Sequence, residues 1–162
     1  MRRKRLDLLH LDATAPMGEV RELFEEYARS LSVDLGFQNF AEELASLPGE
    51  YRPPGGCLVL ARCDGVHVGC GALRALPDCD YANACEMKRV YLRPQYRGLG
   101  FGRQLTVHLL DQARTLGYSC LLLDTLDEME SARGLYESLG FEEIPPYYFN
   151  PISGAHYLKV DL

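Results

Sequence analysis

The residues best suited to chemistry stand between Arg97 and Arg103, in the stretch R-G-L-G-F-G-R. Three glycines alternate there, after a strand-like segment that ends at Pro94 and before a helical pattern. Glycine lets the backbone approach an anion closely. The first N–H groups of a helix lack intrahelical partners and carry partial positive charge. With two arginines beside it, this arrangement predicts a phosphate-binding site. The alternative is a glycine-rich turn that only begins a surface helix.

The spacing of the glycines excludes two well-known nucleotide loops. No Lys-Ser or Lys-Thr pair follows them, as the P-loop pattern requires, and Arg103 stands where the dinucleotide pattern G-x-G-x-x-G requires a third glycine. What remains resembles the acyl-CoA loop [QR]-x-x-G-x-[GA] of the GNAT (Gcn5-related N-acetyltransferase) superfamily, matched here by Arg97, Gly100 and Gly102. The preceding E-M-K-R-V-Y-L-R-P, the later D-T pair and L-Y-E-S-L-G-F extend the resemblance over roughly residues 57 to 161.

The resemblance implies a fold and a co-substrate. The fold is α/β with three layers, a mixed central sheet of about seven strands and about four helices, in one N-acetyltransferase domain over residues 1–162 whose acyl-CoA-binding core is at about 84–117. Acetyl-CoA is the implied co-substrate, without a metal. Its implied contacts lie at the end of the fourth strand, in the glycine loop and on one later threonine: Val90, Tyr91, Leu92, Arg97, Gly98, Leu99, Gly100, Phe101, Gly102, Arg103 and Thr125.

Acyl transfer to an amine needs a base, an oxyanion donor and an acid. An aliphatic amine is mostly protonated at neutral pH, and the leaving thiolate benefits from a proton. The resemblance implies Tyr136 as the acid, because it occupies the tyrosine position of L-Y-E-S-L-G-F. A tyrosine that only packs on the core is the alternative. The oxyanion donors would be backbone N–H groups of Val90 to Leu92, where the fourth strand of the family splays.

The resemblance implies Glu86 as the base, because it lies eleven residues before Arg97. A carboxylate buried on a central strand needs a partner or a purpose. A structural ion pair with Lys88 or Arg89 is therefore the alternative role. Asp124 and Glu142 are the other candidate bases.

The stretch P-P-Y-Y-F-N-P at 145–151 could roof an acceptor pocket, with tyrosine hydroxyls as polar handles. Packing against the first helices, or a dimer contact, is the alternative. By resemblance, the segment from Tyr27 to Phe40 forms another wall. The candidate acceptor contacts are Tyr27, Phe37, Asp124, Tyr147, Tyr148 and Asn150.

Helices and strands that position these residues follow from periodicity. The first half predicts a strand at 5–11, a helix capped by Thr14 with an apolar stripe from Val20 to Leu31, a short helix at 39–47, and a strand pair at 57–62 and 66–76 joined by Asp64-Gly65. The second half predicts a helix at 101–117, an apolar strand at 120–124, a helix at 130–140, and strands at 141–144 and 155–160. Gly69 and Gly71 indicate a bulge or a close approach.

Composition bounds the partners. The chain has 162 residues and a net charge of −6, which disfavours non-specific nucleic-acid binding and mildly favours a cationic acceptor. No apolar run approaches a membrane span, and Asp7, His10 and Asp12 interrupt any signal sequence after the basic start. The six cysteines contain no C-x-x-C pair, so we expect reduced thiols and no metal site in a cytoplasmic protein.

These observations predict an N-acetyltransferase that moves an acetyl group from acetyl-CoA to a primary amine of a small or amino-acid-like molecule by direct attack. We expect a monomer or a homodimer. The alternatives are a peptide or protein N-acetyltransferase, and an acyl-CoA-binding sensor without turnover.

Overall fold

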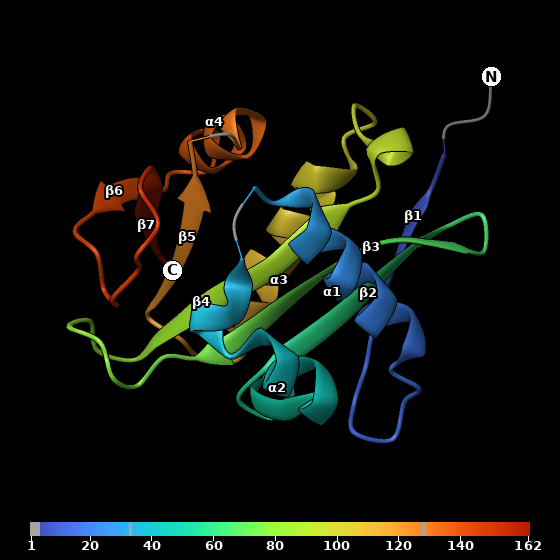
Figure 1. The fold of residues 1–162 in the computed structure, drawn as a ribbon, viewed down its shortest axis with the longest axis horizontal. Coiled ribbons are helices and arrows are strands. Elements are labelled where there is room, and N and C mark those ends of the chain that lie inside the picture. The colour runs from blue at the N-terminus through green and yellow to red at the C-terminus, as the bar shows by residue number, and fades with distance from the viewer. Residues whose placement is uncertain (1–3, 33, 128) are drawn as a thin grey trace.

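A seven-stranded sheet runs through the molecule, in the order β1-β2-β3-β4-β5-β7-β6 (Figure 1). The computed structural model describes residues 4–32, 34–127 and 129–162. The strands are β1 (Leu6–His10), β2 (Cys57–Cys63), β3 (Val66–Ala75), β4 (Ala84–Leu92), β5 (Cys120–Leu126), β6 (Glu142–Ile144) and β7 (Ala155–Asp161). The α-helices are α1 (Gly18–Ser30), α2 (Phe40–Ser46), α3 (Phe101–Thr115) and α4 (Glu130–Ser138), and short 3-10 turns are η1 (Leu35–Gln38), η2 (Gly49–Tyr51) and η3 (Pro94–Tyr96).

Helices cover both faces of the sheet. On one face, α1 buries Val20, Leu23 and Phe24 against β2, β3 and β4, with α2 beside it. On the other face, α3 packs Leu105 and Leu109 into a core that α4 extends. The predicted three-layer α/β fold, with about seven strands and four helices, is therefore confirmed.

The centre of the sheet contains its one parallel pair among the described strands. β4 and β5 are hydrogen-bonded only from Ala84 to Glu86 and from Cys120 to Leu122. Beyond these residues the two strands diverge, whereas the other strand pairs are antiparallel. The divergence opens the centre of the sheet toward the carboxyl ends of β4 and β5.

Two of the predicted glycine features lie in β3. A Cβ built at Gly69 would come within 2.5 Å of the carbonyl oxygen of Tyr91, so only glycine permits this strand pairing. The register of β3 against β4 shifts between Cys70 and Ala72, which is the predicted bulge at Gly71. Asp64 and Gly65 both have positive φ, as a two-residue hairpin turn requires.

One predicted boundary is wrong. Thr14 does not cap α1, which begins at Gly18 with Met17 as its N-cap. The Thr14 backbone N–H and hydroxyl instead donate to Asp12, because the threonine belongs to a tight turn that precedes the helix. In the described ranges, no helix combines the length and the apolar character needed to cross a membrane.

Candidate active site

The glycine loop has the backbone geometry that the sequence predicts. Gly98 and Gly100 have φ of 79° and 81°, a region that favours glycine. Gly100 is the N-cap of α3, and glycine has no side chain with which to cap the first N–H groups. Among the described residues, a Cβ built at Gly98 or Gly100 meets no atom within 4 Å. The loop therefore offers open space in front of a helix N-terminus, which fits a phosphate group.

Side chains fix the loop in place. The Nε of Arg97 donates to the carbonyl oxygen of Leu92 at 3.0 Å, and its guanidinium lies over the ring of Tyr91. Arg103 donates to the Ser138 hydroxyl at 2.8 Å, which ties α3 to α4. Phe101 is buried in the core, so only its backbone can face a ligand.

The neighbouring end of β4 is irregular. Arg89 has a backbone φ of 60°, a conformation that residues other than glycine rarely adopt. The hydrogen-bonded pairing of β4 with β3 is interrupted at this residue. Both oxygens of Glu43 accept hydrogen bonds from Arg89, at 2.9 Å each, so the unusual residue is held by a bidentate ion pair. This bulge and the divergence from β5 open the strand at Val90.

A small cavity of about 70 Å³, here called the inner pocket, lies in this opening. Its walls come from β4, β5, α1, α4 and the β6–β7 loop. Among the residues that line it are Tyr27, Gln38, Lys88, Val90, Asp124, Thr125, Tyr136 and Asn150. The pocket thus brings together six of the predicted site residues: Tyr27, Val90, Asp124, Thr125, Tyr136 and Asn150.

A larger cavity of about 590 Å³, here called the outer chamber, adjoins the inner pocket. Gln38 and Lys88 line both cavities. The outer chamber is also lined by Glu86, Tyr147 and Tyr148, and by acidic residues of α2 and the segments after it. Glu142, by contrast, is exposed on β6 and lines neither cavity.

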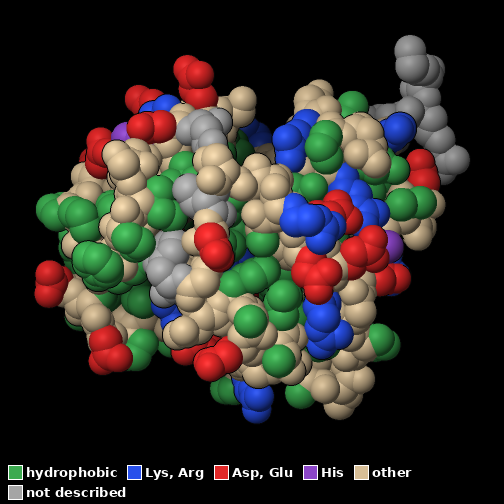
Figure 2. Space-filling model, in the orientation of Figure 1, with side chains coloured by type: hydrophobic (Ala, Val, Ile, Leu, Met, Phe, Trp, Pro, Cys, Tyr) green, Lys and Arg blue, Asp and Glu red, His purple; other side chains and the backbone are tan. Residues whose placement is uncertain are grey.

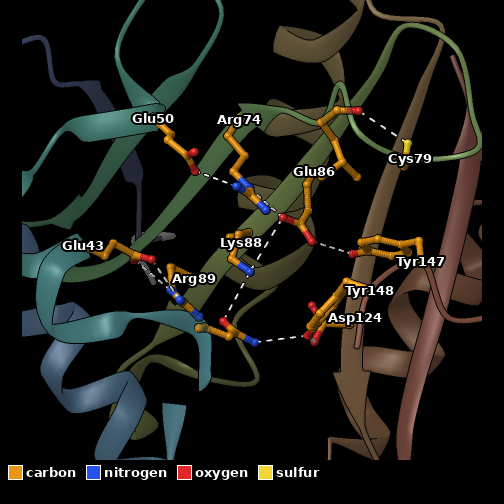
Figure 3. Close-up of polar contacts among 12 residues, drawn as sticks. Glu43, Glu50, Arg74, Cys79, Glu86, Lys88, Arg89, Asp124, Tyr147 and Tyr148 are labelled. Atoms are coloured by element: carbon orange, nitrogen blue, oxygen red, sulfur yellow. Dashed lines mark hydrogen bonds and ion pairs between the residues drawn. The ribbon is translucent and has the colours of Figure 1, made fainter. Parts of the chain in front are cut away.

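Glu86 is the centre of a buried ionic cluster (Figure 3). Its side chain is 1% exposed, and its oxygens accept from Arg74 Nε at 2.7 Å and from the Tyr147 hydroxyl at 2.6 Å. Lys88 Nζ lies 3.7 Å away. Burial raises the pKa of Glu86, but Lys88 and Arg74 outweigh it and the pKa lies below the ordinary 4.5. The structural role predicted as the alternative for Glu86 included an ion pair with Lys88, and the structure contains it. Arg74 is a second ion-pair partner, which the sequence did not predict.

A second hydrogen-bonded chain joins the two cavities. The Tyr148 hydroxyl donates to Asp124 Oδ2 at 2.6 Å and accepts from the side-chain amides of Gln38 and Asn150 at 3.2 Å each. Gln38 Oε1 in turn accepts from Lys88 Nζ at 3.3 Å. The predicted aromatic loop thus reaches across the pocket to β4, β5 and η1.

Tyr136 projects from α4 into the inner pocket. Its ring packs on Phe141, and 7% of the residue is exposed. Burial raises the pKa of Tyr136, so its hydroxyl stays protonated at neutral pH. Burial likewise raises the pKa of Tyr27, to about 12. Both tyrosines can donate hydrogen bonds or a proton, and neither can act as an ionised base at neutral pH.

The remaining predicted residues whose side chains the structure describes do not line either cavity. Tyr91 is buried against α1 and donates to Glu26 at 3.3 Å, whereas Leu99 is exposed on the glycine loop. The side chain of Phe37 lies outside the part of the chain that the structure describes. No three His, Cys, Asp or Glu side chains within residues 4–32, 34–127 and 129–162 lie together in a way that could hold a metal ion.

Of the cavity-lining residues that the sequence does not predict as site residues, three contact Glu86 or Tyr148: Gln38, Arg74 and Lys88. Lys88 could have been found, because it lies two residues after Glu86 and side chains two apart share one face of a strand. Arg74 faces Glu86 through the β3–β4 register, which the sequence does not give. Gln38 lies in an irregular segment without a periodic signal.

Comparison with known proteins identifies the family. The model of the acetyltransferase (GNAT) family matches residues 18–141. An uncharacterized N-acetyltransferase of Schizosaccharomyces pombe is 39% identical over 149 residues, which are 90% of this chain and 88% of that protein. The N-acetylaspartate synthetase of Rattus norvegicus is 36% identical over 93 residues, which are 57% of this chain and 30% of that protein.

Solved structures share the fold. A GNAT family acetyltransferase from Elizabethkingia anophelis with acetyl-CoA bound superposes with a TM-score of 0.68 and 19% identity, covering 97% of this chain and 98% of that one. The glycine loop, the open end of β4 and the pocket tyrosine agree with the family match over most of the chain. This chain therefore belongs to the GNAT acetyltransferase family and is an acyltransferase.

Proposed function

We propose that this protein transfers an acetyl group from acetyl-CoA to a primary amine of a small, amino-acid-like molecule by direct attack. The observation that carries the proposal is the inner pocket, where a carboxylate, a protonated tyrosine and the irregular end of β4 meet. Acetyl-CoA is bound in the Elizabethkingia structure, and the relative from Rattus norvegicus is named for an acetylated amino acid. Both support the proposed reactants.

The glycine loop would hold the pyrophosphate of acetyl-CoA. Gly98 and Gly100 leave room for it, and Arg97 and Arg103 add positive charge at the N-terminus of α3. Backbone N–H groups around Val90 would stabilise the negative charge that develops on the thioester oxygen, which is typically a contribution of about 10²–10³ in rate. Tyr136 would protonate the leaving thiolate.

The base has two candidates, and the geometry favours Asp124 over Glu86. Asp124 lines the inner pocket together with Tyr136, and its Oδ2 accepts a hydrogen bond from the Tyr148 hydroxyl. Glu86 lies in the outer chamber, is 1% exposed and has a lowered pKa, which makes it a weak proton acceptor. We assign proton removal to Asp124 and the placement of Arg74 and Lys88 to Glu86.

Two variants test this assignment. Asp124→Asn should lower kcat about 100-fold or more, since positioned acid–base groups contribute about 10²–10⁴. Glu86→Gln should act chiefly on KM for the acceptor. Steady-state kinetics with one acceptor decide the matter. A kcat loss that is larger in Glu86→Gln than in Asp124→Asn would return the base role to Glu86.

A further inference from the structure

Lys88 is a buried lysine that lines both cavities, and Figure 3 shows its contacts with Glu86 and Gln38. Its side chain is 9% exposed. Burial lowers the pKa of its ammonium group, and the nearby Glu86 carboxylate opposes this shift. An ammonium group has three N–H donors. The only hydrogen bond that Lys88 Nζ makes to a described residue is the one to Gln38 Oε1, and at 3.3 Å it is long for a charged donor.

Two carboxylates that line the outer chamber with Lys88, those of Glu86 and Glu43, accept hydrogen bonds from other residues. Glu86 Oε1 lies 3.7 Å from Lys88 Nζ, beyond hydrogen-bond distance, and accepts from Arg74 instead. The other oxygen of Glu86 accepts from Tyr147. Glu43 is bound at both oxygens by Arg89. Lys88 thus keeps donors unused in a buried place, which is costly unless a ligand supplies the acceptors.

We propose that Lys88 is the specificity-determining anchor for a carboxylate on the acceptor, so that the substrates are amines that also carry a carboxylate, such as free amino acids. The inference rests on the proposed function, because it concerns the acceptor of that reaction. A carboxylate bound at Lys88 would lie at the junction of the two cavities, with the amine directed to Asp124 and Tyr136 in the inner pocket.

The charges around the site agree with an acceptor that has both signs. Lys88 would bind the carboxylate, and Asp124 would attract the ammonium group before it loses its proton. Glu42 and Asp78, at the outer chamber, are exposed and make no ion pair with a described residue, so solvent screens their repulsion of an anion. A diamine would fit Asp124 but would place a second positive charge against Lys88.

The experiment compares matched acceptors and matched variants. Thiol release from acetyl-CoA is measured with alanine and alaninamide, with aspartate, and with a diamine, for the wild type and for Lys88→Met, Lys88→Arg and Lys159→Met. Lys159 is the control, because its ammonium pairs with Asp161 outside both cavities. The ratio of activities with alanine and alaninamide is compared between proteins, so that the difference in amine basicity cancels.

We expect the wild type to prefer the free acid. Lys88→Met should raise KM for the acid about 10-fold to 100-fold, as expected for a lost hydrogen bond to a charged group, and change KM for the amide by less than about 3-fold. Lys88→Arg should restore part of the preference, and Lys159→Met should match the wild type.

Several results would overturn the inference while the acetyltransferase proposal stands. These are a wild type that prefers the amide or the diamine, an equal effect of Lys88→Met on acid and amide, or a kcat loss that Lys88→Arg does not rescue at all. If none of the amines caused thiol release, the proposed function itself would be refuted. In that case, calorimetry of N-acetylalanine binding to the CoA-loaded protein still tests the role of Lys88. Binding to the wild type that is lost in Lys88→Met would support the carboxylate anchor. Equal binding to both proteins, or no binding to the wild type, would contradict it.

Discussion

At the scale of single residues, removing the hydroxyl of Tyr136 should affect catalysis with little effect on packing. Its ring packs on Phe141, and phenylalanine at 136 keeps that packing. If Tyr136 is the proposed positioned acid, Tyr136→Phe should lower kcat about 100-fold or more and leave the Kd for acetyl-CoA within about 2-fold. Single-turnover kinetics and calorimetry measure the two quantities. Unchanged turnover would mean that thiolate departure needs no proton from this residue.

A second prediction at this scale concerns the contribution of Glu86 to the stability of the fold. Glu86→Gln removes the buried charge that is hydrogen-bonded to Arg74 and lies 3.7 Å from Lys88, and removing one partner of a buried ion pair costs about 3–5 kcal/mol. We expect the lower end of that range, because Arg74 keeps its ion pair with Glu50. Chemical denaturation measures the free energy of unfolding, with the exposed Glu25→Gln as the control.

The pH dependence of that difference has a definite sign. The pKa of Glu86 in the folded protein lies below the ordinary 4.5, because of Lys88 and Arg74. The carboxylate therefore stabilises the fold fully above about pH 4.5, and this contribution is lost as the pH falls through the folded-state pKa. The stability gap between the wild type and Glu86→Gln should narrow below pH 4.5. A gap that stays constant down to pH 3 would contradict the assigned ion pair.

At the scale of elements, a substitution at Gly102 in α3 should have different effects on stability and on acetyl-CoA binding. A Cβ at Gly102 would meet Leu92 at an ordinary 3.7 Å, and alanine is the better helix former by about 1 kcal/mol. Gly102→Ala should thus keep or raise stability, while the added methyl group hinders the approach of a pyrophosphate to the start of α3. We expect at least a 10-fold rise in the Kd for acetyl-CoA by calorimetry.

The matched control is Gly134→Ala in α4, where a Cβ meets no described atom within 4 Å. It should share the gain in stability but not the loss of affinity. Equal acetyl-CoA affinity in both variants would show that Gly102 is only a helix residue and that the pyrophosphate lies elsewhere.

The elements also show what a single sequence can predict. The glycine loop, the hairpin at Asp64-Gly65 and the strand patterns depend on local chemistry, so the sequence predicts them with nearly correct bounds. The partners of Glu86 depend on which residue of β3 faces which residue of β4. That register is a long-range property shifted by a bulge, so Arg74 could not be identified from the sequence.

The acceptor side shows the same limit. Tyr147 and Tyr148 were noticed because three aromatics between prolines are unusual, but their targets, Glu86 and Asp124, are 61 and 24 residues away. Gln38 was missed because it lies in η1, where no periodic pattern marks one face. Side chains that meet only after three segments fold together leave no local signal.

At the scale of the whole molecule, charges of both signs are interspersed over α1 on the face shown in Figure 2. Two carboxylates of α1, Glu22 and Glu26, form ion pairs with Arg93. The face shown in Figure 2 therefore has no broad basic surface that could bind nucleic acid, which is consistent with the net charge of −6. The proposed acceptor site lies instead in the two cavities beside β4 and β5.

A ligand that binds the folded state raises the stability of the entire domain. We expect one cooperative thermal transition, and a rise in Tm of about 5–11 °C at an acetyl-CoA concentration 100 times its Kd, which corresponds to about 2.7 kcal/mol. Scanning calorimetry with and without acetyl-CoA checks this. Two separate transitions, only one of them shifted, would contradict a single domain.

The most direct test of the central claim is thiol release from acetyl-CoA by the wild type and by Tyr136→Phe, over a panel of amino acids, their amides, diamines and short peptides. The account predicts release with free amino acids and a drop of about 100-fold or more in the variant. Binding of acetyl-CoA without release to any amine would contradict it, and would favour an acyl-CoA sensor instead.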